Sequence, residues 1–173
     1  MTGWRLIFLF LVLASCTGTE KVTERRYVDL KGFFTEEISR LGKSKAKVNK
    51  TVSRNGSSES KDNISPDWNI ELSLFSESDI NKPAWSNSYV VSENNDSTSY
   101  IATDNKLRTR SILIRKNRDG GIAQLSIVNS TKNHLYSSSE ELLYIPDSLY
   151  QIIKKQDVLV LGNNSYKISG FFN

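Results

Sequence analysis

The sequence predicts an α+β domain, in which an antiparallel, meander-like β-sheet carries two main helices and one short helix on one face. Two stretches place apolar residues at steps of three and four, the spacing of an amphipathic helix. Short β-like runs follow one another with turn residues between them at hairpin spacing, which favours antiparallel pairing. Hydrophobic residues make up 38% of the chain and charged residues 24%, which are ordinary values for a globular protein.

The N-terminus contains one basic residue, a short apolar run and the single cysteine of the chain, in that order. Residues 6–14 form an uninterrupted apolar run behind Arg5. Nine helical residues extend about 14 Å, roughly half of the hydrocarbon core of a bilayer, so the run predicts a signal peptide and not a spanning helix. The run ends in residues 13–16, with the letters LASC, which resemble the lipobox. Cys16 is the single cysteine of the chain.

This pattern predicts that residues 1–15 are removed as a lipoprotein signal peptide and that Cys16 is lipidated. A short polar tether over 16–23 and a single domain over 24–173 follow. Several acyl chains on one cysteine, palmitate among them, make a stable membrane anchor. The next residue is Thr17 and not Asp, which by resemblance to lipoprotein sorting rules favours the outer membrane of a Gram-negative bacterium. The periplasmic and the surface-exposed orientation both stay open. The alternative is an ordinary secretory leader with Cys16 unmodified.

The first half of the domain predicts two helices and a hairpin. The first helix stops at Gly42, and its apolar face consists of Tyr27, Leu30, Phe34, Ile38 and Leu41. The pair Asn55-Gly56 predicts a type I′ turn between strands over about 45–54 and 57–64, a polar and exposed hairpin. A second helix begins with Ser65 as N-cap and ends near Asp79 or Ile80. Its apolar face consists of Trp68, Leu72 and Phe75.

The second half predicts strands over 89–91, 100–102, 107–114, 122–128 and 135–144. The sequence Pro146-Asp147-Ser148 predicts the cap of the short third helix, whose apolar face consists of Leu149, Ile152 and Ile153. A closing hairpin over 158–161 and 166–172 turns at Asn163-Asn164. The sequence contains no internal repeat and no heptad pattern.

Charge and the rare residue types exclude several function classes. Lysine and arginine total 23 against 19 acids, a surplus too small to indicate a nucleic-acid partner. One cysteine and one histidine exclude Cys-based and His-based metal sites. A Ser-His-Asp triad would depend on His134, which we expect to be a polar turn residue. The sequence has no nucleophile-turn or phosphate-loop motif, so it predicts a non-enzymatic protein without a cofactor.

A hydrolase that uses carboxylates alone is the remaining enzymatic hypothesis. The adjacent acids Glu36-Glu37 and Glu140-Glu141 would supply its acid and base. We favour solvated faces for both pairs, because neighbouring side chains point in different directions. The hydrolase hypothesis predicts two acids that face each other across a cleft.

Five residues are candidates for ligand binding. Arg108, Arg110 and Lys116 form a basic strip that fits anionic glycans or lipid headgroups. The alternative for this strip is a solvated sheet edge, where charge prevents edge-to-edge pairing. Trp85 and Tyr89 form a candidate aromatic platform for a sugar or an acyl chain. The alternative is that Trp85 pins the crossover from helix to sheet.

Two serines are candidate sites of modification. Ser97 and Ser148 follow an aspartate and precede Thr and Leu, which fits a short O-glycosylation motif of Bacteroidota envelope proteins. The pattern is loose, and Ser148 has a structural reason to be present as part of a helix cap.

Three stretches resemble a family of small uncharacterised Bacteroidota lipoproteins: 78–85 (SDINKPAW), 144–154 (YIPDSLYQIIK) and 166–172 (YKISGFF). The resemblance implies an envelope location and no particular activity. The leading hypothesis is therefore a lipid-anchored, non-enzymatic interaction or structural domain with an envelope protein or glycan as partner. The alternative is a binding module that holds a glycan or apolar ligand between sheet and helices, in a pocket lined by Phe34, Trp85 and Tyr89.

Overall fold

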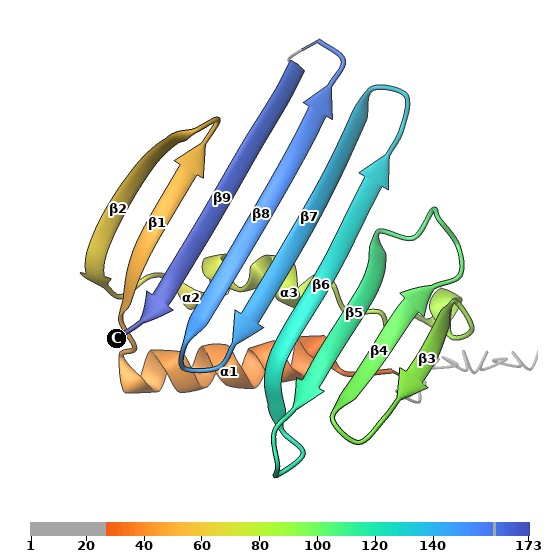
Figure 1. The fold of residues 1–173 in the computed structure, drawn as a ribbon, viewed down its shortest axis with the longest axis horizontal. Coiled ribbons are helices and arrows are strands. Elements are labelled where there is room, and N and C mark those ends of the chain that lie inside the picture. The colour runs from red at the N-terminus through yellow and green to blue at the C-terminus, as the bar shows by residue number, and fades with distance from the viewer. Residues whose placement is uncertain (1–26, 161) are drawn as a thin grey trace, which may run out of the picture.

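The computed structural model describes residues 27–160 and 162–173 (Figure 1). The predicted signal peptide, Cys16 and the whole predicted tether lie outside these residues. The described chain forms one antiparallel sheet of nine strands in the order β2-β1-β9-β8-β7-β6-β5-β4-β3. From β3 to β9 each strand pairs with the next along the chain, and β9 then pairs with β1. The predicted antiparallel meander is confirmed.

The four strands in the middle of the sheet, β6–β9, are the longest, with ten or eleven residues each. Their bounds are β1 Val48–Arg54, β2 Ser57–Ile64, β3 Tyr89–Glu93, β4 Ser97–Ala102, β5 Thr109–Lys116, β6 Ile122–Lys132, β7 Tyr136–Ile145, β8 Leu149–Val158 and β9 Gly162–Phe172. The first hairpin turns at Asn55 and Gly56, with φ of 50° and 89°, as the type I′ signal predicts.

The first predicted helix is α1, Leu30–Ser44. The Asp29 side chain caps it by accepting a hydrogen bond from the Gly32 amide. The helix does not stop at Gly42, because the left-handed residue that ends it is Lys45, with φ of 51°. Leu30, Phe34 and Leu41 are buried, as the spacing predicts.

The expectation of a second main helix is wrong. Two four-residue helices stand in its place, α2 (Trp68–Glu71) and α3 (Ser73–Ser76), and Asp67 is the N-cap in place of Ser65. The helix is interrupted at Leu72, whose φ of −100° and ψ of 6° depart from helical values. The predicted apolar face is nevertheless correct, since Trp68, Leu72 and Phe75 are all buried. A short 3-10 helix, η1 (Pro83–Trp85), follows.

The expectation of a short third helix after Pro146 is also wrong, because Leu149–Val158 is the strand β8. Asp147, with φ of 56°, closes a tight turn that returns the chain beside β7. Pairing with β7 and β9 along both edges then fixes the extended conformation. The closing hairpin turns at Leu159 and Val160, and the predicted turn residues Asn163 and Asn164 lie inside β9.

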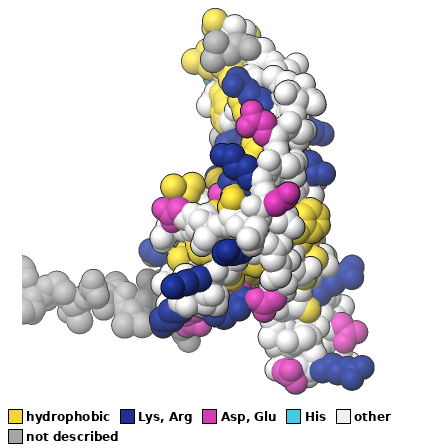
Figure 2. Space-filling model, turned by 90° about the vertical axis from the view of Figure 1, so that its left-hand side faces the viewer, with side chains coloured by type: hydrophobic (Ala, Val, Ile, Leu, Met, Phe, Trp, Pro, Cys, Tyr) yellow, Lys and Arg dark blue, Asp and Glu magenta, His cyan; other side chains and the backbone are white. Residues whose placement is uncertain are grey.

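The helices cover only part of one face of the sheet. Phe34 of α1 packs against Phe75 of α3 and Tyr144 of β7, with ring centroids 5.2 and 5.3 Å apart. Figure 2 shows the sheet from its β2 edge, with the helix layer on one side of its lower part and the upper part standing free. The far ends of β6–β9 therefore extend beyond the helices (Figure 1). Among the described helices, none is long and apolar enough to cross a membrane.

Candidate functional site

The predicted aromatic platform is not an open surface. Tyr89 is 7% exposed, its hydroxyl donates to the Thr109 carbonyl at 2.9 Å, and burial raises the pKa of Tyr89 to about 12. Trp85 is half-buried, and the Lys82 Nζ lies 4.0 Å from the centroid of its ring. The backbone carbonyl of Trp85 accepts a hydrogen bond from the Tyr27 hydroxyl at 3.1 Å. Phe34 is fully buried in the core, so these aromatics line no common pocket. The geometry favours the alternative interpretation, in which Trp85 holds the crossover from helix to sheet in place.

The predicted basic strip is divided by the sheet. The pairing of β5 with β6 is irregular at two places, between Thr109 and Ser111 and between Arg115 and Lys116. At these places the side chains of β5 do not alternate regularly between the two faces of the sheet. Lys116 forms an ion pair with the exposed Glu93.

The two arginines of the strip have separate partners. Arg110 donates to the Asp104 carbonyl at 2.7 Å. Arg108 forms an ion pair with Glu140 at 2.7 Å and also donates to the Glu77 carbonyl at 3.3 Å. Of the three residues of the strip, Arg108 is the one that lines the cleft described below.

Of the remaining predicted residues, Ser148 and His134 lie in turns, Ser97 is the first residue of a strand, and Cys16 is not described. Ser97 starts β4 and its Oγ donates to the Asn94 side chain at 2.9 Å, whereas Ser148 is exposed in the turn between β7 and β8. His134 is an exposed turn residue between β6 and β7, as expected. The predicted lipidation site Cys16 lies outside the described residues.

A cleft of about 830 Å³ lies between the helix layer and the far ends of β6–β8, with Arg108 just before β5 beside them, and we call it the helix-side cleft. One wall comes from α3 and the loop that follows it, together with Lys31 of α1. The floor comes from the strands. The lining residues are Lys31, Leu74, Ser76, Glu77, Asp79, Asn81, Lys82, Arg108, Thr131, Tyr136, Ser138, Glu140 and Lys154.

A buried carboxylate forms the charged centre of the cleft floor. Glu140 of β7 is 6% exposed and accepts from Arg108 at 2.7 Å, from Lys154 at 3.0 Å and from the Asn129 amide at 3.3 Å. Burial by itself would raise the pKa of Glu140, but the Lys154 hydrogen bond and the Arg108 charge hold it below its usual value. Glu140 is therefore an anion at neutral pH. The expectation that Glu140 is solvated is wrong, while Glu141 on the opposite face is exposed.

Two buried polar atoms beside Glu140 have no hydrogen-bond partner among the described residues. They are the Ser138 Oγ and the Asn129 Oδ1, on side chains 7% and 1% exposed. The orientation of the Asn129 amide is fixed, because its Nδ2 donates to the Ser78 Oγ at 2.9 Å and to Glu140. A buried polar group without a partner costs about 1–3 kcal/mol. Ser138 lines the helix-side cleft, so its hydroxyl favours a ligand that forms hydrogen bonds there.

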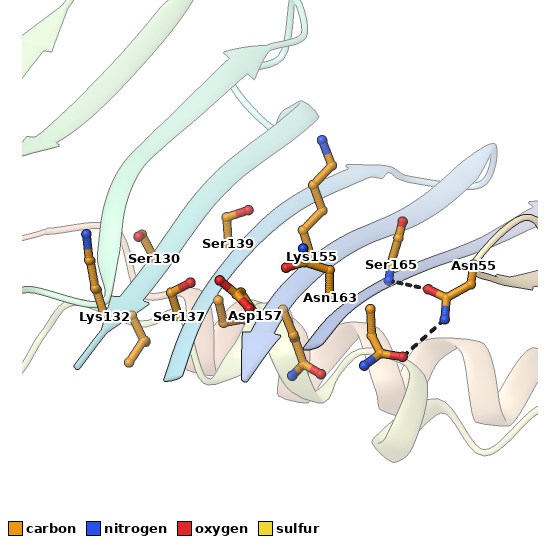
Figure 3. Close-up of a pocket in the computed structure, with 13 residues that line it drawn as sticks. Asn55, Ser130, Lys132, Ser137, Ser139, Lys155, Asp157, Asn163 and Ser165 are labelled. Carbon is orange, nitrogen blue, oxygen red and sulfur yellow. Dashed lines mark hydrogen bonds between the residues drawn. The ribbon is translucent and has the colours of Figure 1, made fainter. Parts of the chain in front are cut away.

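The opposite face of the same strand ends carries a second hollow of about 450 Å³, the outer groove (Figure 3). The labelled strand side chains in Figure 3 project from the face turned away from α1. They form two rows across β6–β9, namely Ser130, Ser139, Lys155 and Ser165, and Lys132, Ser137, Asp157 and Asn163.

The outer groove is less preorganised than the helix-side cleft. Asn55 ties its far edge to β9, because the Asn55 Oδ1 accepts from the Ser165 amide at 2.8 Å. The other side chains of its two rows are exposed, except for the half-buried Ser137. The helix-side cleft, with a buried ion-paired floor, is therefore the stronger candidate site.

Two other buried glutamates join helices to the sheet and lie outside the cleft. Glu37 of α1 accepts from the Tyr144 hydroxyl and pairs with Arg40 at 2.7 Å. Burial would raise the pKa of Glu37, but the hydrogen bonds from Arg40 and Tyr144 lower it. Glu71 of α2 accepts from the Tyr150 hydroxyl at 2.8 Å. Glu37, like Glu140, is thus not the solvated acid that the sequence predicts.

The sequence reasoning missed the residues that form the cleft floor. Ser138, Glu140, Leu142 and Tyr144 share one face of β7, because side chains alternate along a strand. The signal was present, since a serine and a glutamate continue a face that is otherwise aromatic and aliphatic. Comparison with protein-family models, curated proteins and solved structures finds no match for this chain.

Proposed function

We propose that this protein is a lipid-anchored envelope lipoprotein whose domain is a non-catalytic binding module, and that its helix-side cleft binds a hydroxyl-rich ligand of the glycan class. The observation that carries the proposal is the buried, unpartnered Ser138 hydroxyl beside the ion-paired Glu140, because both residues line the cleft. A lipid anchor on Cys16 rests on the sequence pattern.

Sugar hydroxyls match the groups that the cleft presents. Each hydroxyl donates and accepts, so one group can donate to Ser138 or Glu140 while it accepts from Lys154. The Tyr136 ring lines the same cleft, and its hydroxyl is held by Gln156 at 3.1 Å. Aromatic rings offer sugars an apolar surface beside such polar groups. A volume of about 830 Å³ lies within the usual range for small-ligand sites.

The electrostatics support binding over hydrolysis. A general acid requires a carboxyl with a raised pKa, whereas Lys154 and Arg108 overcome the effect of burial and lower the pKa of Glu140. Asp79, on the opposite wall, uses both carboxylate oxygens to accept from the backbone amides of Lys31 and Asn81, at 3.2 and 2.8 Å. These acids act as fixed acceptors.

The test is glycan binding by the chain from residue 16 with Cys16→Ser, which contains every described helix and strand. We expect saccharides from a glycan array to bind, and titration calorimetry to give an affinity about fivefold weaker for Ser138→Ala, since one hydrogen bond is lost. Ser139→Ala is the matched control, because this exposed neighbour lies on the opposite face of the same strand. No binding to any saccharide would refute the glycan class. A loss only in Ser139→Ala would assign the ligand to the outer groove.

The anchor has its own test. Intact mass spectrometry of the native protein should find a chain that starts at an acylated Cys16, and Cys16→Ala should leave the membrane fraction. A soluble, unmodified native chain would contradict the anchor without affecting the cleft.

A further inference from the structure

The free end of the sheet carries an exposed apolar tip. Leu135 lies in the turn between β6 and β7, and Leu159 and Val160 lie in the turn between β8 and β9. Their exposed fractions are 66%, 74% and 88%. The Leu159 amide donates to the Leu135 carbonyl at 3.0 Å, so the two turns are held side by side. Figure 2 shows hydrophobic side chains at the upper end of the sheet.

Basic side chains lie directly below the tip on the outer face. Lys132 of β6 and Lys155 of β8 line the outer groove, with Asp157 as the single acid among its lining residues. His134 lies in the same turn as Leu135. This end of the sheet is thus apolar at the tip and carries a small positive charge on the outer face next to the tip. Such a combination suits an anionic lipid surface.

We propose that this tip inserts into the headgroup region of a lipid bilayer as a membrane contact separate from any acyl chain. Three aliphatic side chains are far too few for a stable protein interface, which buries about 800 Å² per partner. A bilayer needs no complementary surface, because each aliphatic side chain enters the interface independently while lysines keep their charge among the headgroups. The inference does not rest on the proposed glycan site.

The chain length allows this contact to form on the bilayer that holds Cys16. Residues 16–27 reach at most about 40 Å when extended. The eleven residues of β9 extend about 36 Å, so residues 16–27, when extended, match the length of the longest strands. The N-terminal end of the described chain lies beside β3 and β4, away from the tip (Figure 1). An anchored domain can therefore lie with its tip on the same membrane.

The experiment is vesicle co-sedimentation of the chain from residue 16 with Cys16→Ser, using phosphatidylethanolamine–phosphatidylglycerol vesicles. We expect the chain to pellet with these vesicles and the Leu159→Ser/Val160→Ser variant to bind more than about tenfold more weakly. The matched control is Val90→Ser/Ile101→Ser, which removes a 59% and a 56% exposed side chain paired across β3 and β4. The control should bind as the parent chain does.

A second readout follows insertion directly. With Cys16 replaced, Val160→Cys carries the only thiol for an environment-sensitive fluorophore, whose emission should shift to the blue on addition of vesicles. Parent protein that stays in the supernatant, equal loss in the control variant, or an unshifted fluorophore would each overturn the proposal. Concentration-dependent dimerisation abolished by the tip variant would assign the tip to a second copy of the chain and would also overturn it.

Discussion

Gly170 in β9 leaves space for a buried tyrosine on the facing strand. Gly170 is paired with Tyr150 of β8, and a Cβ at position 170 would lie 2.1 Å from the Tyr150 Cε1 and 2.4 Å from the Cζ. The ring cannot easily withdraw, because Tyr150 is fully buried and its hydroxyl donates to Glu71 at 2.8 Å. Overpacking of a core costs about 1–3 kcal/mol, so we expect Gly170→Ala to lower the free energy of unfolding by about 3 kcal/mol.

The matched substitution is Gly42→Ala in α1, where nothing lies within 4 Å of the added Cβ. Alanine favours a helix interior, so this variant should be more stable by about 0.5–1 kcal/mol. Both free energies come from urea denaturation followed by circular dichroism. In a Tyr150→Leu background the cost of Gly170→Ala should fall below about 1 kcal/mol, since the ring that opposes the Cβ is gone. An equal cost in both backgrounds would refute the packing of Tyr150 over Gly170.

Three further predictions concern the buried acids and a turn serine. Tyr144→Phe leaves Glu37 with Arg40 alone and should cost about 1–2 kcal/mol by the same denaturation, and an unchanged midpoint would contradict the hydrogen bond. The folded-state pKa of Glu140 is lowered, so its contribution to stability is complete above the unfolded pKa of about 4.3 and declines as pH falls toward the folded value. In Glu140→Gln the free energy of unfolding should therefore fall less steeply as the pH is lowered below about 4.3. An unchanged pH dependence at acid pH would argue against the ion pairs of Glu140. If the protein is O-glycosylated, the exposed Ser148 is the favoured site, and Ser148→Ala should remove the extra mass from the native protein.

Local sequence signals predicted the first hairpin turn and the buried face of α1, although that helix ends at Lys45 and not at Gly42. The Asn55-Gly56 pair adopts the positive φ values that a type I′ turn requires, and it sets the register of β1 with β2. The spacing of Leu30, Phe34 and Leu41 likewise predicted the buried face of α1. In these segments local preference and tertiary packing agree.

Prediction from the sequence was wrong where one apolar pattern fits both a helix and a strand and pairing with other strands decides between them. Leu149, Ile152 and Ile153 fit a helical face, but in β8 they lie on both faces of a strand paired on each edge. Asp147 and Ser148, which suit a helix cap, also suit the tight turn that they form. No local signal separates these alternatives, because the strands that decide between them lie elsewhere in the chain.

The candidate site was hidden for a related reason. Glu140 stands next to Glu141, and two adjacent acids suggest solvent exposure until alternation along β7 is taken into account. Its partners Arg108 and Lys154 lie 32 positions before and 14 positions after it in the sequence. Only the order of strands β5–β8 brings the three charges together.

The dimensions of the helix layer and of the sheet explain why the helix-side cleft and the outer groove lie at the far ends of β6–β9. A helix with its side chains is about 10 Å wide, so α1 and the row of α2 and α3 cover about 20 Å of strand length. Strands β6–β9, of ten or eleven residues, extend about 33–36 Å. About 15 Å of these strands therefore has no helix against it, and core burial cannot be the reason for its length. On that segment the sequence places serines, asparagines and lysines on both faces. At the boundary between that segment and the helix layer Glu140, Asn129 and Ser138 are buried, and Glu140 and Ser138 line the helix-side cleft beside α3. The Ser138 Oγ and the Asn129 Oδ1 are buried there without a partner, which opposes stability, and this is why we propose that the helix-side cleft binds a ligand.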